Sequence, residues 1–89
     1  MPTPLIPMTQ HLPIRPAWAC RRCGRLWPCP AGKGDLAVEF VGRPALLIYF
    51  LAARMVEFTS DLAARGQSPA DDIYPRFVDW ARPSTVRAA

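Results

Sequence analysis

The sequence predicts a mainly α fold, a small three-helix domain that follows an extended, cysteine-rich N-terminal segment. From residue 33 onward, apolar residues recur at helical spacing, and glycines or prolines stand at the ends of these repeats. Before residue 31, seven prolines oppose regular helix, and this part also holds every cysteine and the one histidine. A chain of 89 residues is long enough for one domain with a modest core.

The first residues predict no regular structure. Residues 1–10 are proline-rich and predict a disordered arm, and residues 11–19 carry Pro13 and Pro16, whose spacing favours extended backbone. The start of the chain lacks a basic stretch followed by an unbroken apolar run, so no secretory signal is predicted and we expect a cytoplasmic protein.

Four potential metal ligands lie within nineteen residues: His11, Cys20, Cys23 and Cys29. Cys20 and Cys23 form a C-x2-C-G turn that aims two sulfurs at one point, and Gly24 supplies the backbone freedom of such a turn. Cys29 can provide a third corner and His11 the fourth. Three thiolates and one imidazole make a tetrahedral set suited to structural zinc, so the segment is predicted to be an extended zinc-binding loop.

Other interpretations of these residues stay open. The cysteines could be buried thiols that pack as small apolar groups, and Asp35 or a water could replace His11 as the fourth ligand. Thiolates also bind iron–sulfur clusters, so an iron–sulfur cluster is the alternative cofactor. A disulfide framework is disfavoured because the number of cysteines is odd.

Each of two cysteines stands two residues after a tryptophan, as Trp18-Ala-Cys20 and Trp27-Pro-Cys29. In extended chain, residues two apart share a face, so each indole is expected beside its sulfur, where it would form a dry wall around the metal. A simpler and compatible interpretation is that both tryptophans pack on the helices.

Two helices are predicted in the middle of the chain, over residues 33–41 and 44–65, with Gly42 and Gly66 as their C-terminal glycines. Pro44 stands at the first turn of the second helix, where proline is tolerated. Along that helix, Asp61 and Arg65 are spaced as an ion pair. The expected core comprises Phe40, Leu47, Leu51, Met55, Phe58, Phe77 and Trp80.

A third helix is predicted to start at Ser68, as N-cap, with Pro69 in first position. Pro75 interrupts this pattern, so the helix either bends there or begins near Pro75. The expected domain spans residues 11–82, and residues 83–89 are predicted to fray.

The net charge of +4 comes from the N-terminal part. Residues 1–34 contain no acidic residue and five basic ones: Arg15, Arg21, Arg22, Arg25 and Lys33. Arginines around the loop would offset the negative charge of three thiolates on a divalent ion, and this interpretation is preferred. The alternative is a nucleic-acid footprint. The longest apolar stretch, residues 44–53, is far shorter than a membrane span, so no membrane partner is expected.

The run H-x-P-x-R-P-x-W-x-C-x-x-C-G-x-x-W-P-C, from His11 to Cys29, resembles a family of small actinobacterial proteins of unknown function. The resemblance covers residues 11–82 and implies a similar small fold. Members are often labelled flavin reductase. The cysteine spacing is also similar to that of WhiB-like proteins, which carry an iron–sulfur cluster and regulate transcription. Those proteins use a fourth cysteine where this chain has His11, and a Gly-rich tryptophan turn that this chain lacks.

No catalytic set is found in the sequence, which has no G-x-G-x-x-G motif and no P-loop. The expected function is therefore a small, zinc-binding, non-catalytic accessory or adaptor protein that binds another protein through aromatic residues such as Tyr49, Trp18 and Trp27. The first alternative is a WhiB-like or zinc-dependent nucleic-acid-binding regulator using Arg15, Arg21, Arg22 and Arg25. The third possible function, after the adaptor and the regulator, is a flavin reductase.

Overall fold

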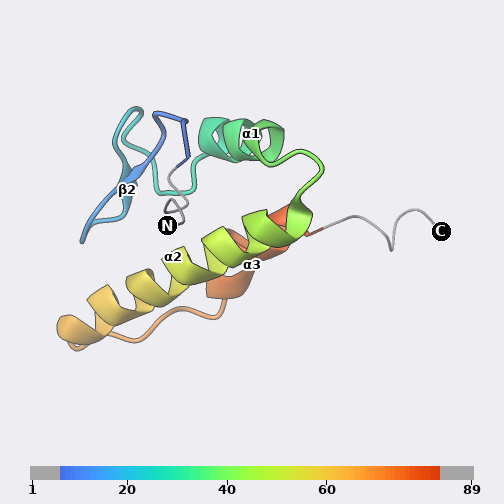
Figure 1. The fold of residues 1–89 in the computed structure, drawn as a ribbon. Coiled ribbons are helices and arrows are strands. Elements are labelled where there is room, and N and C mark those ends of the chain that lie inside the picture. Colours follow the sequence, from blue (N-terminus) through green and yellow to red (C-terminus); the bar gives the residue numbers. More distant parts are fainter. Residues whose placement is uncertain (1–6, 83–89) are drawn as a thin grey trace, which may run out of the picture.

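The computed structural model describes residues 7–82 of the chain. Its elements are β1 (Pro13–Ile14), β2 (Ala19–Cys20), α1 (Pro30–Glu39), α2 (Pro44–Ala64), α3 (Ile73–Phe77) and a 3-10 helix, η1 (Asp79–Ala81). Three helices and one very small sheet confirm the predicted mainly α, three-helix fold (Figure 1). The predictions for residues 1–6 and 83–89 lie outside the described residues.

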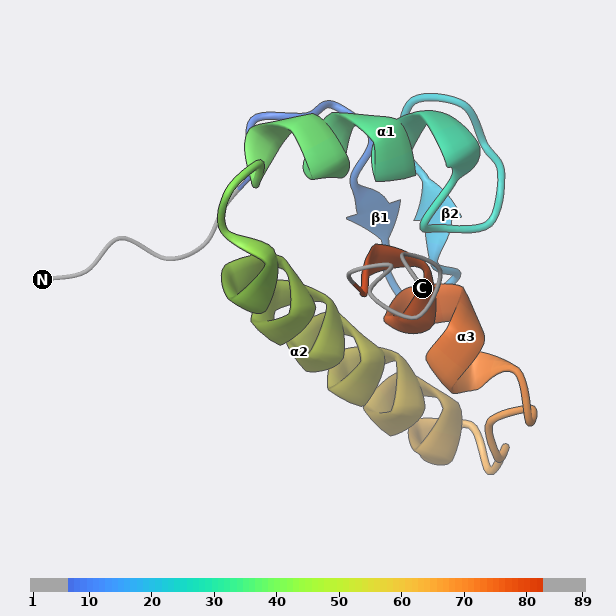
Figure 2. The same ribbon diagram turned by 90° about the vertical axis from the view of Figure 1, so that its right-hand side faces the viewer.

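The N-terminal segment folds back on itself as a narrow ribbon. β1 and β2 pair antiparallel, with Pro13 opposite Cys20 and Ile14 opposite Ala19, and Ala19 also bridges Leu26. In Figure 2 the two strands lie below α1 and above α3 in the view.

The last four residues of the predicted N-terminal arm, residues 7–10, form no helix or strand and contact α1. The backbone N–H of Met8 donates to a carboxylate oxygen of Glu39 at 2.7 Å. The buried hydroxyl of Thr9 donates to Asp35, also at 2.7 Å. Two acidic side chains of α1 therefore hold residues 7–10 against that helix, which sequence periodicity could not indicate.

Helix α1 begins three residues earlier than predicted and ends at Glu39 rather than residue 41. Pro30 does not block the helix, because it occupies the first helical position, where its missing N–H costs no hydrogen bond. Cys29 is the N-cap, and its sulfur accepts the N–H of Gly32 at 3.3 Å. Gly42, with φ of 78°, follows the helix as expected.

Helix α2 matches its prediction to within one residue, and Gly66 follows it with φ of 70°. It runs diagonally across the molecule, with α3 packed beside it (Figures 1 and 2). No helix within residues 7–82, α2 included, is both long enough and apolar enough to cross a membrane.

The third helix does not start at Ser68, since residues 67–72 are not helical. α3 begins at Ile73, which places Pro75 in its first turn, where proline breaks no helical hydrogen bond. The alternative of a helix starting near Pro75 is therefore the better prediction. After α3 the chain continues into the 3-10 helix η1.

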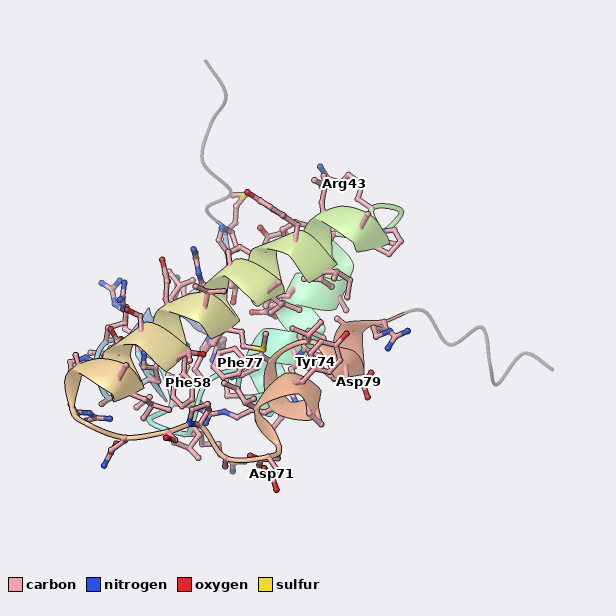
Figure 3. All side chains as sticks on the ribbon, turned by 90° about the horizontal axis from the view of Figure 1, so that it is seen from below. Arg43, Phe58, Asp71, Tyr74, Phe77 and Asp79 are labelled. Atoms are coloured by element: carbon pink, nitrogen blue, oxygen red, sulfur yellow. The ribbon has the colours of Figure 1, made fainter. Side chains whose placement is uncertain are left out.

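All seven predicted core residues belong to the core or pack against it. Figure 3 shows Phe58 of α2 and Phe77 of α3 meeting between the two helices, and their ring centroids are 5.1 Å apart. The prediction did not include these core members: Trp18, Trp27, Leu36, Phe50 and Val78. Trp18 and Trp27 are completely buried, so the N-terminal segment supplies the centre of the core and not only a cover for one end.

Candidate metal centre

The four predicted ligands come together in the fold. One ligand atom from each of His11, Cys20, Cys23 and Cys29 lies within 4.8 Å of all the others. The Nδ1 atom of His11 is 3.3 Å from the sulfur of Cys20 and 3.4 Å from that of Cys29. Ligand atoms bonded at about 2.0–2.3 Å in a tetrahedron around one ion are about 3.5–3.8 Å apart. The group is therefore positioned to hold a single metal ion.

The C-x2-C turn has the expected geometry. Gly24 has φ of 76°, and its N–H donates to the carbonyl of Cys20 at 2.9 Å. The N–H of Arg22 points to the sulfur of Cys20 at 3.4 Å. Backbone donors to a sulfur stabilise its thiolate, the form that binds metal.

Cys29 reaches the site from the N-terminus of α1. Its role as N-cap places its sulfur against the positive end of the helix dipole, a position that favours an anion. The residue is completely buried, while Cys20 is nearly so and Cys23 is exposed. Cys29 therefore both caps the start of α1 and supplies a candidate metal ligand.

The backbone of His11 is hydrogen-bonded on both sides. Its N–H donates to the hydroxyl of Thr9 at 3.1 Å, and its carbonyl accepts the indole N–H of Trp27 at 2.8 Å. Asp35, the alternative fourth ligand, instead accepts the hydroxyl of Thr9 and is not part of the ligand group.

Gly32 is a functional residue that sequence reasoning missed. A Cβ atom at this position would lie 3.1 Å from the Cβ of His11 and 3.2 Å from the sulfur of Cys29. The absence of a side chain allows α1 to approach both ligands. Its position three residues after Cys29, in the first turn of a helix, is the feature of the sequence that could have indicated this close approach.

The cysteines differ in their proton affinity. Burial raises the pKa of the Cys20 thiol, but the N–H groups of Cys23 and Arg22 and the ring of His11 outweigh burial and lower this pKa to about 6. Burial raises the pKa of Cys29 to about 11, despite the N–H of Gly32. At neutral pH the metal-free site therefore holds a thiolate at Cys20 and a thiol at Cys29, whose proton a metal must displace.

The tryptophans do not form an interaction surface, contrary to the prediction. Trp18 donates its indole N–H to Asp61 on α2 at 2.7 Å, and Trp27 uses its own N–H on His11. Their ring centroids are 6.0 Å apart, and both pack against Phe77. Packing on the helices is thus the correct interpretation of both residues.

The backbone at Trp18 is not regular extended chain. Its φ of 58° lies in the left-handed region, which is rare and strained for a bulky residue. The buried indole, held by Asp61 and the aromatic cluster, keeps the residue in that conformation.

The arginines of the loop divide into two groups. Arg15 pairs with Asp61 through two hydrogen bonds of 2.8 and 3.0 Å, so it ties the loop to α2 rather than extending a basic surface. Asp61, expected to pair with Arg65, is thus the partner of Arg15 and Trp18. Arg15 lowers the pKa of this carboxyl to about 2.

The remaining three arginines, Arg21, Arg22 and Arg25, are exposed around the C-x2-C turn. Arg22 donates to the side chain of Gln10 at 2.8 Å. With Arg21 and three neighbouring residues, it lines a pocket of about 390 Å³.

Comparisons of the chain with protein-family models, with curated proteins and with solved structures gave no match.

Proposed function

We propose that this protein is a small, zinc-stabilised accessory protein that acts by binding another protein and not by catalysis. The observation that carries the proposal is the set of four ligand atoms within 4.8 Å of one another, on a loop whose tryptophans form the centre of the core. Such a site supplies folding energy, on the order of 10 kcal/mol or more in small zinc domains. Membership of the small actinobacterial family that the loop motif resembles is part of this proposal.

Zinc fits the ligand spacing better than an iron–sulfur cluster does. In a [4Fe–4S] cluster each thiolate binds a different iron, so the sulfurs stand apart by the width of the cluster. Here His11 Nδ1 lies within 3.4 Å of two sulfurs, which is the separation expected around one ion. The complete set of four protein ligands is also typical of structural rather than catalytic zinc.

Metal analysis tests this assignment. The purified protein is expected to contain about one zinc per chain and to be colourless. Replacing zinc with Co²⁺ should give the visible bands of a tetrahedral thiolate site, and Cys20→Ser should weaken them. A brown protein that contains iron would favour the WhiB-like alternative, and a metal-free protein that stays folded would contradict both.

Nucleic-acid binding is the second candidate, favoured by the three exposed arginines around the turn. Three phosphate contacts would give a log–log salt slope of about −2.7 on duplex DNA. We expect no such binding at low salt. Binding with this slope, reduced in an Arg21→Gln, Arg22→Gln variant, would replace the protein-binding proposal.

A flavin reductase is the third candidate and is tested separately. It requires oxidation of a reduced nicotinamide that depends on added flavin. We expect none, because the sequence has no dinucleotide fingerprint.

A further inference from the structure

The outer face of α2 carries no charged side chain. The three charged residues of this helix, Arg54, Glu57 and Asp61, are half-buried, and the latter two face Arg15 of the loop. The exposed residues of α2, which the structure describes in full, are Pro44, Ala45, Leu46, Tyr49, Val56, Ser60, Ala63 and Ala64. A helix that is apolar around most of its circumference is normally covered on both sides.

Six residues of this face repeat in steps of three and four, and we call them the outer stripe: Leu46, Tyr49, Ala53, Val56, Ser60 and Ala63. This is the spacing of a seam between two paired helices. Tyr49 is 67% exposed and Val56 63% exposed, so the stripe contains large uncovered groups.

We propose that a second copy of this chain covers the outer stripe, with the two α2 helices antiparallel about a twofold axis. The sizes of the side chains support this arrangement. Two large residues, Leu46 and Tyr49, begin the stripe, and two small ones, Ser60 and Ala63, end it. An antiparallel pair centred between residues 54 and 55 sets Leu46 against Ala63 and Tyr49 against Ser60, while Ala53 faces Val56. A parallel pair would instead set large residues against each other and leave gaps between the small ones.

The charges are compatible with the same arrangement. The stripe itself is neutral, so the net charge of +4 is not concentrated at the contact. Antiparallel helices oppose their dipoles favourably. Arg54 and Glu57, which pair at 3.0 Å within one copy, lie beside the midpoint and on the same flank in both copies. Because these two side chains pair with each other and lie off the stripe, neither places an unpaired charge in the contact.

The small area of the outer stripe indicates a weak association between the two copies. Eighteen residues of helix are about 27 Å long and about 10 Å wide, which gives a footprint of about 300 Å² per copy. Stable interfaces bury about 800 Å² per partner. An interface this small is typical of weak, transient complexes, so the proposed dimer is reversible and is favoured by high protein concentration. The inference goes beyond the zinc site and does not depend on it.

Sedimentation equilibrium of the zinc-loaded protein, up to about 1 mM, tests the association. Val56→Arg places a charge in the stripe and should weaken dimerisation about tenfold or more. Val38→Arg makes the same substitution at an exposed site on α1, 74% exposed and outside the stripe, and should leave the dimer unchanged. Helical circular dichroism and zinc content should be the same in all three proteins.

Two outcomes would overturn the proposal. One is a wild-type protein that stays monomeric throughout the concentration range. If Val56→Arg then disrupts binding of a different protein, the stripe is a docking site for that protein and not for a second copy. The other is equal weakening by both variants, which would indicate a general charge effect.

Cross-linking tests the orientation. In the antiparallel pair, residue 49 of one copy faces residue 60 of the other, so Tyr49→Cys chains mixed with Ser60→Cys chains should form disulfide-linked dimers. Neither variant should link to itself beyond the level of the zinc-loaded wild type. Self-linkage of Tyr49→Cys would show a parallel pair and overturn the proposed arrangement.

Discussion

At the scale of single residues, the ligand set depends on positions that carry no ligand. Gly32 leaves room for His11 and Cys29, and Thr9 and Trp27 hold the backbone of His11 from opposite sides. These contacts fix the backbone that carries the His11 imidazole, so we expect the metal affinity of the site to be sensitive to small changes around it.

Gly32→Ala is expected to weaken zinc binding and to destabilise the loaded protein by about 1–3 kcal/mol, because the new methyl group would lie only 3.1 and 3.2 Å from two candidate ligand side chains, which would have to shift. Gly34→Ala is the matched control, since a Cβ at this helical position meets nothing within 4 Å. The control should gain about 0.5–1 kcal/mol. Competition with a chromophoric chelator and urea unfolding measure both effects. Equal behaviour of the two variants would show that α1 does not approach the ligands as described.

Zinc affinity is expected to rise with pH. The raised pKa of Cys29, about 11, means that the metal-free site keeps this proton through the neutral range, whereas the zinc-bound thiolate has lost it. Lower pH therefore favours the metal-free state. Each proton released gives about a tenfold change in affinity per pH unit. Below a pH of about 6, Cys20 also takes up a proton and the dependence steepens. Chelator competition at several pH values checks this, and an affinity independent of pH would contradict it.

At the scale of elements, α2 and α3 both contact the candidate metal loop through polar side chains. Asp61 of α2 accepts from Arg15 and Trp18, and Arg76 of α3 donates to the carbonyl of Trp27 at 2.8 and 3.2 Å. The loop is thus fixed from two sides.

Arg76→Lys is expected to destabilise the protein by about 1–3 kcal/mol, because lysine cannot make both hydrogen bonds to Trp27. It would also lose the stacking of the guanidinium, whose centre lies 4.8 Å from the ring of Phe58. Arg82→Lys, at an exposed pair with Asp79, should change stability by less than about 0.5 kcal/mol. Chemical denaturation of the zinc-loaded proteins measures the difference, and equal stabilities would contradict the proposed role of Arg76.

Leu51→Ala is expected to cost about 2–5 kcal/mol, since Leu51 is completely buried and its loss leaves a cavity. Val56→Ala on the exposed side of the same helix should cost far less at low protein concentration. A negligible loss at Leu51 would indicate that this face of α2 is not the core.

The accuracy of the sequence predictions depended on how local the determining interactions are. α2 was predicted to within one residue, and the grouping of His11 with the three cysteines was predicted from their spacing, because both signals lie within short stretches. The start of α1 was missed because proline both breaks helices and begins them, and only the cap at Cys29 distinguishes the two cases. The burial of Trp18 could not be predicted, because its partner Asp61 is 43 residues away.

At the scale of the whole molecule, the candidate metal site and the core share residues. The core of residues 7–82 includes Trp18, Cys20, Trp27 and Cys29, all from the loop. Without the loop, the helices lose the two largest groups between them, Trp18 and Trp27. We therefore infer that the helices are not stable alone.

Removal of zinc by a strong chelator is expected to abolish the cooperative unfolding transition and to expose the tryptophans to solvent. Readdition of zinc should restore both. Tryptophan emission and helical circular dichroism, followed in the same titration, should change together. A chelated protein that retains a sharp thermal transition would show that the helices fold independently of the site.

The indole pair also gives the molecule an optical signature of its own. Trp18 and Trp27 are held 6.0 Å apart with their planes inclined at 53°. Two strong transition dipoles this close, in a fixed and skewed arrangement, exchange excitation and split into bands of opposite rotational sign. The signal exists only while both stretches of the loop are seated between the helices. Its amplitude in the ultraviolet circular dichroism spectrum therefore reports loop docking without any label.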